Sequence, residues 1–188
     1  MLIGFTGAQC TGKSTLLNLL KDQLTGREWK FVPEVTRKVM RTGLSINEDG
    51  DNLTQLFILS EHLRNHVVGE NENWVLDRCI LDGYVFTRWL WQQGSVEKWV
   101  LDHANNLLSM LGERLNHILY TEPDDIPIEN DGERSVNVDF RNDIINIYEE
   151  IMSSTMMTPG RDTWRKKVVR LTGTVEERME TINKTILK

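Results

Sequence analysis

The most constraining feature of the sequence is the segment at residues 7–14, which reads Gly-Ala-Gln-Cys-Thr-Gly-Lys-Ser and matches the pattern G-x-x-x-x-G-K-[ST] at every fixed position. The apolar residues 2–6 before it predict a short buried strand, and residues 15–20 after it favour a helix. Glycine allows a tight turn whose backbone N–H groups point inward, and the helix adds its positive end. The segment therefore predicts a loop that cradles phosphate groups.

The residue types of this loop indicate how it would hold a nucleotide. Lys13 would reach the β- and γ-phosphates of ATP, and the Ser14 hydroxyl would be a ligand of Mg²⁺. The residues predicted to bind ATP are Gly7, Ala8, Gln9, Cys10, Thr11, Gly12, Lys13, Ser14 and Thr15. Two interpretations of Cys10 stay open, namely a redox-sensitive thiol at a helix N-terminus and a small side chain that fills the loop.

Length and composition limit the class of protein. The 188 residues, 39% of them hydrophobic, predict one domain over residues 1–188. A formal net charge of -6 argues against a protein that coats nucleic acid through bulk charge, although a local basic groove stays open. The two cysteines are too few for a disulfide framework, and neither a membrane span nor a signal peptide is visible. We therefore expect a cytoplasmic protein, in the host cytoplasm if its source is viral, with no membrane partner.

Apolar strands alternate with amphipathic helices along the rest of the chain. The predicted strands are 2–6, 29–32, 74–76, 117–120 and 168–171, and the later predicted helices are 53–68, 80–91, 96–115, 139–152 and one that begins near 174. This alternation predicts right-handed crossovers and an α/β fold with a parallel sheet between two layers of helices. In such a sheet, ligands bind beyond the carboxyl ends of the strands.

Charged residues follow the strand predicted at 29–32. Glu34 and Arg37 are three residues apart, so one helical turn would place them on the same face. The Glu34 carboxylate would accept a proton from an attacking hydroxyl, and Arg37 would hold that carboxylate or bind the acceptor. A solvated helix start is the alternative interpretation.

A second charged pair, Asp77 and Arg78, follows the strand predicted at 74–76. Asp77 would hold Mg²⁺ or act as the base, and Arg78 would bridge phosphate and carboxylate. The alternative is a structural ion pair. Asp82, four residues further on, is expected on the surface of its helix.

The polar stretch at residues 121–138 suits a short lid over the nucleotide. Arg134 lies within it and Arg141 follows it, and either arginine would neutralise the charge that spreads over a transferred phosphoryl group. An ordinary surface loop is the alternative interpretation.

Histidines and tryptophans give weaker signals. His62 and His66 have the i,i+4 spacing of metal ligands, but a third ligand is not evident, which favours a solvated or substrate-facing helix face. Trp99 is predicted on the core face of its helix. Trp89 and Trp91 are two residues apart and cannot both face the core, so one of them is expected near the acceptor side.

A basic strip is the feature that contact with DNA would require in so acidic a chain. Positively charged residues cluster around Trp164, and they fit either a nucleic-acid contact or a solvated edge. The strip consists of Arg161, Arg165, Lys166 and Lys167.

Together these segments resemble the P-loop nucleoside and nucleotide kinases, a group that includes thymidylate kinases and deoxynucleoside kinases. The likeness is greatest to the NadR-type kinase domain and to small phage P-loop kinases, one branch of which phosphorylates 5-hydroxymethyluracil within DNA. It spans most of the chain and rests on residues 7–14, 32–37, 76–78, 131–135 and 171–178. The second nucleotide-transfer motif that accompanies NadR is not found, which weakens a role in pyridine-nucleotide metabolism.

The resemblance implies a P-loop NTPase fold with sheet order 2-3-1-4-5 and a short lid. It implies that Glu34 matches the base of deoxynucleoside kinases, that Asp77 and Arg78 match the acid–arginine pair after the third strand, and that Arg134 lies in the lid. The turn at 171–176 would border the adenine of ATP.

The sequence thus predicts an ATP- and Mg²⁺-dependent kinase that phosphorylates a hydroxyl of a nucleoside-type acceptor. The specific prediction is 5-hydroxymethyluracil in DNA, and the alternative is a free nucleoside or nucleoside monophosphate. The predicted catalytic residues are Lys13, Glu34, Asp77, Arg78 and Arg134, and the predicted metal ligands are Ser14 and Asp77. An ATP-hydrolysing switch and a regulatory ATP-binding module are the competing classes, and a guanine-recognition motif is not found.

Overall fold

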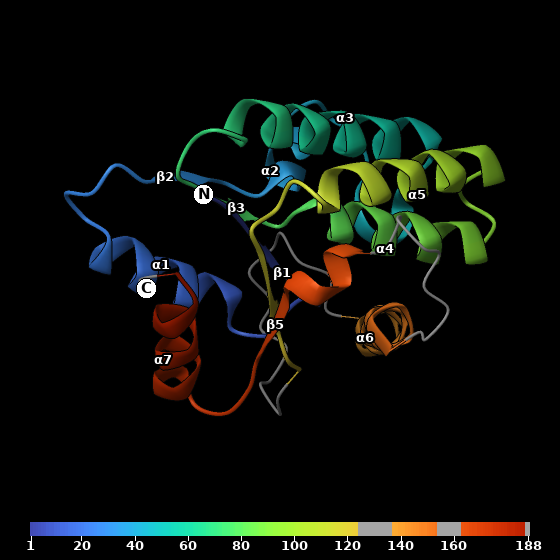
Figure 1. The fold of residues 1–188 in the computed structure, drawn as a ribbon. Helices are drawn as coiled ribbons and strands as arrows, with labels where there is room; N and C mark the ends of the chain where they lie inside the picture. The colour runs from blue at the N-terminus through green and yellow to red at the C-terminus, as the bar shows by residue number, and fades with distance from the viewer. Residues whose placement is uncertain (124–136, 154–162, 187–188) are drawn as a thin grey trace.

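The computed structural model describes residues 1–123, 137–153 and 163–186, and a parallel sheet forms its centre (Figure 1). The strands are β1 (Leu2–Thr6), β2 (Lys30–Val32), β3 (Trp74–Asp77), β4 (His117–Thr121) and β5 (Val168–Leu171). Their order is β2-β3-β1-β4-β5, and every neighbouring pair is parallel. The α/β fold and the strand order expected from the sequence are therefore confirmed.

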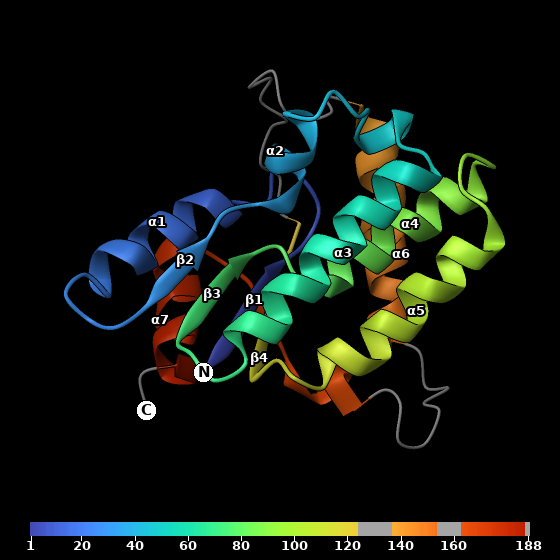
Figure 2. The same cartoon turned by 90° about the horizontal axis from the view of Figure 1, so that it is seen from above.

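Helices cover both faces of the sheet, which gives three layers (Figures 1 and 2). The described helices are α1 (Lys13–Gln23), α2 (Val35–Met40), α3 (Asn52–Gly69), α4 (Ile80–Gln92), α5 (Lys98–Gly112), α6 (Val138–Ser153) and α7 (Val175–Ile186), with short 3₁₀ segments η1 (Asn47–Asp49) and η2 (Thr163–Lys167). Helices α1 and α7 lie on one face, and α3, α4, α5 and α6 lie on the other. Helix α2 lies beyond the carboxyl end of β2 (Figure 2).

The sheet divides the hydrophobic core into two main clusters. On the α1 and α7 face, the buried side chains include Ile3, Phe5, Leu16, Leu20 and Ile182. On the other face, a larger cluster includes Leu2, Ile80, Val100, Ile144 and Trp164. All five residues of β1 are buried, which is the pattern of a central parallel strand covered on both sides. The residues that follow β1 are therefore held on a rigid support.

Most helix boundaries agree with the sequence patterns. The break between α4 and α5 occurs where predicted, with Gly94 at a φ of 79°. At the start of α7, the backbone N–H of Thr174 donates to Glu177 Oε2 at 2.8 Å, and the N–H of Glu177 donates to Thr174 Oγ1 at 3.3 Å. These two bonds form the capping box that the Thr174–Glu177 spacing indicates.

The tryptophans divide between core and surface. Trp89 is buried and its Nε1–H donates to Asp143 Oδ2 at 3.0 Å, whereas Trp91 is 38% exposed, so one of the pair is exposed as expected. The prediction for Trp99 is wrong, because that side chain is 52% exposed. The buried face of α5 follows Val100, Ala104, Leu107 and Leu111, and Trp99 lies about 100° around the helix from Val100.

Two further findings bear on the class of protein. In the described part of the chain, every helix is too short or too polar to cross a bilayer. Cys10 and Cys79 are both free and buried. The two thiols form no disulfide, in agreement with the prediction from the cysteine count.

Candidate active site

The predicted phosphate loop lies between the end of β1 and the start of α1. Its backbone turns through left-handed conformations at Gly7 (φ 134°), Cys10 (φ 54°) and Gly12 (φ 81°). At Gly7, an added Cβ would lie 2.6 Å from Thr121 Oγ1, so both the conformation and the space require glycine. Cys10 is buried, at 8% exposure.

Lys13 points back into this loop. Its ammonium donates to Gly7 O at 2.9 Å, to Thr11 Oγ1 at 3.2 Å and to Ala8 O. Burial, followed by repulsion from Arg78, lowers the pKa of Lys13 to about 7, although Asp82, Glu34 and Asp77 act in the opposite direction. The side chain is only 7% exposed, so the loop holds a dehydrated ammonium at the position expected for phosphate.

The rest of the loop is fixed by threonines and by the first turn of α1. The Thr11 hydroxyl lies 3.0 Å from Ala8 O and 2.7 Å from the hydroxyl of Thr121, which donates to Thr6 O at the end of β1. Ser14 is half-buried and Thr15 is exposed, both in the first turn of α1. β4 thus supports the loop from the side opposite β3.

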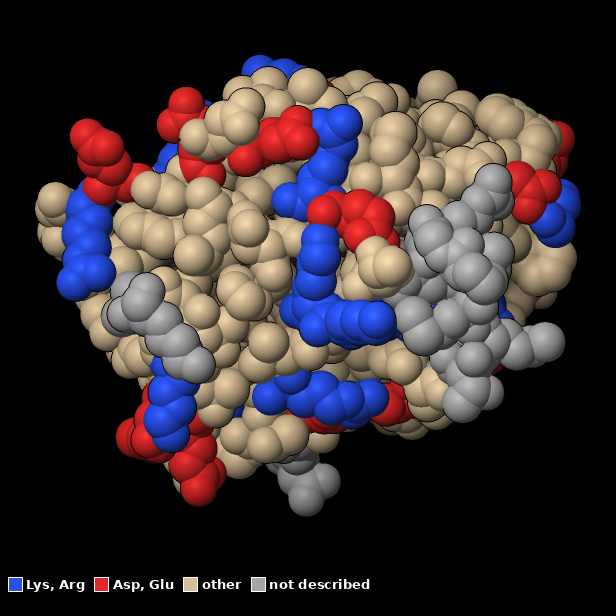
Figure 3. All heavy atoms as spheres, in the orientation of Figure 1, with Lys and Arg blue, Asp and Glu red and all other residues tan. Residues whose placement is uncertain are grey.

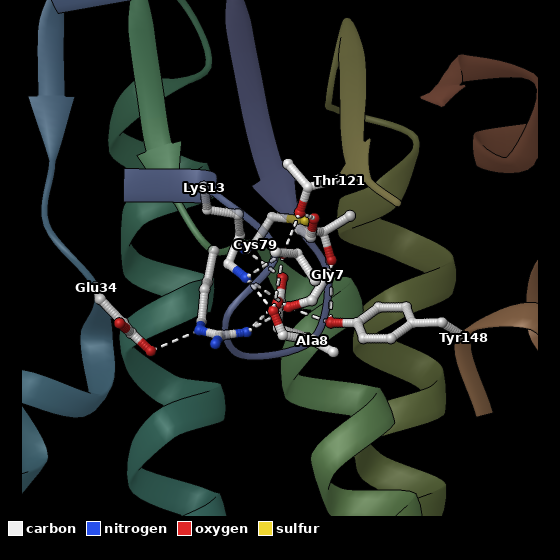
Figure 4. A network of polar contacts seen from close by, with 11 residues as sticks. Gly7, Ala8, Lys13, Glu34, Cys79, Thr121 and Tyr148 are labelled. Atoms are coloured by element: carbon white, nitrogen blue, oxygen red, sulfur yellow. Dashed lines mark hydrogen bonds and ion pairs between the residues drawn. The ribbon is translucent and has the colours of Figure 1, made fainter. Parts of the chain in front are cut away.

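Arg78 is the centre of the charged network beside the loop. Its Nε donates to Glu34 Oε1 at 2.5 Å, and its Nη1 donates to Asp82 Oδ1 at 2.8 Å and to Gly7 O at 3.0 Å. Figure 4 shows this network between Glu34 and Tyr148, with Lys13 and the loop between them. Arg78 has a φ of 71°, so it leaves β3 through a sharp turn. The geometry brings together Lys13, Glu34 and Arg78, three of the residues that the sequence singles out as candidates.

The prediction for Asp82 is wrong, because its side chain is 2% exposed. Asp82 occupies the third position of α4, and its Oδ2 accepts from the backbone N–H of Cys79 at 2.9 Å. Side chains in the first turn tilt toward the helix N-terminus, which here faces the phosphate loop. Tyr148 of α6 donates to Asp82 Oδ1 at 2.8 Å and accepts from Thr6 Oγ1 at 3.1 Å. The Cys79–Asp82 spacing is a sequence signal for this cap, but Tyr148 offers only core periodicity.

The carboxylates near the loop differ in their ionisation. Burial alone would raise the pKa of Glu34, but Arg78, Thr36 and Lys13 outweigh it and lower the value to about 2. Burial and the charge of Glu34 raise the pKa of Asp77, although Arg78 and Lys13 act against them. Within the described residues, Asp77 accepts no side-chain hydrogen bond, whereas Glu34 is bonded to Arg78. Asp77 is thus the carboxylate free to take a ligand.

A small hollow, with a cavity volume of about 40 Å³, opens beside Arg78, between α2, α3 and α4. Its lining combines a charged end with apolar and amide side chains: Glu34, Thr36, Asn47, Gln55, Ile58, His62, Arg78, Asp82, Gly83 and Phe86. The guanidinium carbon of Arg78 lies 5.3 Å from the centre of the Phe86 ring. Sequence reasoning missed Gln55 and Phe86, whose positions in helices resemble those of ordinary core residues.

The two histidines of α3 are buried and not solvated. His62 is 2% exposed and lines the hollow, and His66 is fully buried behind it. His66 Nδ1 lies 2.8 Å from the carbonyl of His62. Among the described residues, no group of three or more histidine, cysteine and acidic side chains could hold a metal ion. His62 packs against Gly83 of α4, where an added Cβ would lie 3.2 Å from the imidazole.

Comparisons with known proteins agree with this geometry. Residues 2–178 match the AAA_28 family, described as an AAA domain. The chain belongs to this family. No curated protein matches the sequence. Among solved structures, the chain is similar to thymidylate kinase from Candida albicans, with a TM-score of 0.63 and 16% identity over 99% of this chain and 90% of that chain. The shared architecture is the P-loop NTPase fold.

Besides Arg78, the sequence singled out Arg134, Arg141 and Arg37 as candidates for the site. Arg134 lies outside the described residues, so its predicted lid role stays a prediction. Arg141 of α6 reaches the phosphate loop, where its Nε donates to Gln9 O at 3.2 Å. Gln9 itself is buried, and its side-chain amide has no partner among the described residues. Arg37 lies on the exposed side of α2.

The basic strip around Trp164 is far from the phosphate loop. Residues 163–167 precede β5 and lie at the amino end of the sheet, whereas the loop follows the carboxyl end of β1 in the same parallel sheet. Figure 3 shows basic side chains over this region with acidic ones among them. Lys167 pairs with Glu113, and Arg170 pairs with Glu122 and Glu149. Arg161 lies outside the described residues. This placement favours the solvated-edge interpretation.

Proposed function

We propose that the protein is an ATP-dependent kinase that transfers the γ-phosphoryl group to a hydroxyl of a nucleoside-type acceptor. The main support is the lining of the hollow beside Arg78. Its amide and apolar side chains would contact an acceptor molecule, and hydrolysis of ATP by water does not need such contacts. The lining combines a few polar groups with apolar side chains, as small-molecule sites do. The similar fold of a thymidylate kinase described as having broad substrate specificity agrees with such an acceptor.

In this proposal the phosphate loop binds the triphosphate of ATP. The buried ammonium of Lys13 gains phosphate oxygens in place of the loop carbonyls that it now contacts. Arg78, next to Gly7, stabilises the negative charge that spreads over the transferred group. The segment at residues 171–176, from the end of β5 to the first turn of α7, borders the adenine.

Magnesium fits the oxygen groups at the edge of this loop. Ser14 and Asp77 would hold it, since hydroxyl and carboxylate oxygens are the hard ligands that Mg²⁺ accepts. Few protein ligands are needed, because phosphates and waters complete the shell of Mg²⁺ in kinases. When bound, the ion neutralises charge between the β- and γ-phosphates.

Glu34 is the residue that positions the acceptor hydroxyl. It lines the hollow, whereas Asp77 does not, and geometry is the first criterion for such a role. A carboxylate with a pKa of about 2 stays ionised and accepts the hydrogen bond of the hydroxyl. A strong base is not required, because the transition state of phosphoryl transfer is loose.

The hollow has the features of a base-binding pocket. Gln55 and Asn47 offer amide groups, and Phe86 and Ile58 offer apolar surface. The sequence resemblance favours 5-hydroxymethyluracil in DNA as the acceptor. A free nucleoside or nucleoside monophosphate fits the same lining.

Transfer of labelled γ-phosphate from ATP tests this proposal directly. The acceptor panel should contain ribosylnicotinamide, deoxynucleosides, their monophosphates, and DNA with thymine or 5-hydroxymethyluracil. We expect Glu34→Gln to lower transfer about 100-fold or more while ATP affinity stays within about threefold. Asp77→Asn should raise the Mg²⁺ concentration for half-maximal rate by about tenfold or more.

The matched control is Glu150→Gln, since Glu150 forms an exposed ion pair with Arg88 away from the loop. This variant should transfer phosphate as well as the wild type. Full activity of Glu34→Gln with its best acceptor would reject the role given to Glu34.

ATP hydrolysis coupled to a partner is the second candidate, because the family is described as an AAA domain. The two functions differ in their response to acceptors. ATP turnover that is indifferent to every acceptor in the panel would exclude the kinase and favour the hydrolase.

A further inference from the structure

A second depression lies on the outer side of Glu34, along the edge strand β2. It is an open groove of about 570 Å³ between β2, α2 and α3. Five basic side chains line it, namely Lys30, Arg37, Lys38, Arg41 and Arg64, against two acidic ones, Glu34 and Glu61. The chain as a whole has a formal charge of -6, so this concentration of positive charge opposes the overall balance.

The acidic side chains of the groove neutralise little of this charge. Glu61 lies 2.6 Å from Lys38 and 3.9 Å from Arg64, so one carboxylate serves two cations. Glu34 is bonded to Arg78, which lies outside the groove. All five basic residues are exposed. In the strip around Trp164, Lys167 contacts Glu113, and beside the strip Arg170 of β5 contacts two further glutamates.

The groove adjoins the hollow of the candidate active site. Glu34 lines both of them. From Glu34 the groove runs back along β2 to Lys30, a distance of about 13 Å at the rise of roughly 3.3 Å per strand residue. Figure 2 shows β2 at the edge of the sheet, with α2 beyond its carboxyl end and α3 on the neighbouring face. A ligand in the groove would thus end at the carboxylate proposed to position the acceptor.

The chemistry of the lining indicates the kind of ligand. One phosphate occupies one or two cations, whereas five exposed cations spread along the groove suit a chain of phosphates. An aromatic face for stacking is absent from the described lining, because Trp74 is 7% exposed and lies under the Lys30 ammonium at 4.1 Å. Contacts to phosphates without contacts to bases give binding that is independent of sequence.

We propose that this groove binds the phosphodiester backbone of a nucleic-acid strand. This inference rests on the proposed kinase function, in which the bound strand presents its acceptor hydroxyl to Glu34 in the hollow. The basic site that an acceptor in nucleic acid requires is therefore the groove along β2, not the strip around Trp164.

Binding of fluorescent single-stranded DNA and RNA of about 12 nucleotides, followed by anisotropy, tests the groove without any transfer step. The test variant is Lys30→Glu/Arg41→Glu/Arg64→Glu. The matched control, Lys21→Glu/Arg27→Glu/Lys166→Glu, makes the same change in net charge on exposed residues outside the groove. ATP binding should be equal in both variants, which verifies that each is folded.

We expect the groove variant to lose about tenfold or more in affinity, and its plot of log affinity against log salt to flatten by about 2. The control should stay within about threefold of the wild type. Equal loss in the two variants would overturn the proposal, as would failure of the wild type to bind either strand at about 50 mM salt. A nucleoside monophosphate should displace the fluorescent strand less well than an unlabelled strand does at the same concentration of phosphate groups. Equal displacement would overturn the proposal in favour of a mononucleotide site.

Phosphate transfer separates this inference from the proposed function. If strand binding depends on the groove but no acceptor is phosphorylated, the kinase proposal fails and the binding site stands. If a free nucleoside is phosphorylated equally by the groove variant and the wild type, and no strand binds, the groove proposal fails and the kinase stands.

Discussion

The ammonium of Lys13 is surrounded by oxygens of its own loop, so a negatively charged ligand at this place would change its protonation. Burial is the main reason that its pKa falls from 10.5 to about 7. A triphosphate brings several negative charges to the same place, which favours the protonated form and raises the pKa again. In the proposed function, binding of ATP is therefore coupled to protonation of Lys13.

We expect ATP binding at pH 8 to take up close to one proton, and ATP affinity to fall by up to about tenfold per pH unit above 7. Calorimetry in two buffers of different ionisation enthalpy measures this uptake. The exposed Lys184 pairs with Glu180, and Lys184→Ala should leave the uptake unchanged. Arginine stays protonated, so any residual binding by Lys13→Arg should occur without uptake. Binding by the wild type without proton uptake would show that Lys13 is already charged in the free protein.

Two buried histidines of helix α3 make the stability of the protein depend on pH. Burial lowers the pKa of His62 to about 4, and burial together with repulsion from His62 lowers that of His66. Both imidazoles are neutral in the folded protein, whereas in the unfolded chain they accept protons near pH 6.5. The unfolded state therefore binds more protons between pH 6.5 and 4, and stability falls as the pH drops through this range.

We expect the shift of His62 alone to cost about 3 kcal/mol of unfolding free energy by pH 4. Urea unfolding between pH 7.5 and pH 4.5 measures the dependence. His62→Gln/His66→Gln should be less stable at pH 7.5 and should show a flatter pH dependence than the wild type. The control is His103→Gln, an exposed position on α5, which should retain the wild-type slope. A double variant with the wild-type slope would assign the acid sensitivity to other groups.

The sequence predicted elements and the loop better than it predicted individual contacts. Periodicity locates β1, α3 and α6 because burial along each element repeats with the period of its secondary structure. The phosphate loop is local, so one segment contains nearly all the information about its shape. Arg78 and Glu34 were found because parallel strands end at a common edge.

The errors concern properties that depend on tertiary packing. Asp82 was placed on the surface because a carboxylate in a helix is usually solvated, whereas here Tyr148, from α6, covers it. The groove along β2 combines residues of three elements, and their proximity is set by how α2 and α3 pack through Val35, Val39 and Ile58. Neither the contact between Tyr148 and Asp82 nor the groove along β2 produces a pattern within a single segment of the sequence.

At the scale of the whole molecule, Arg178 connects parts that are distant in sequence. From the first turn of α7 it donates to Thr11 O at 2.9 Å in the phosphate loop, to Glu122 O at 3.2 Å after β4 and to Gly173 O at 3.0 Å before α7. The side chain is 2% exposed. The last described helix thus holds the phosphate loop, which follows the first strand of the chain. A substitution in α7 should therefore change the conformation of that loop.

We expect Arg178→Ala to destabilise the protein by about 3 kcal/mol, because three carbonyls lose a charged donor in a buried place. ATP affinity should also fall by about tenfold, since the Thr11 carbonyl and the loop around it are no longer held. Urea unfolding and calorimetry at a temperature where the variant is folded separate the two effects.

Arg178→Lys keeps the charge but not the fork of donors, so it should recover only part of either loss. Arg114→Ala removes a surface ion pair with Glu70 and should cost less than about 1 kcal/mol, with unchanged ATP affinity. If Arg178→Ala loses stability but binds ATP as the wild type does, the phosphate loop holds its shape without α7, and the connection is structural alone.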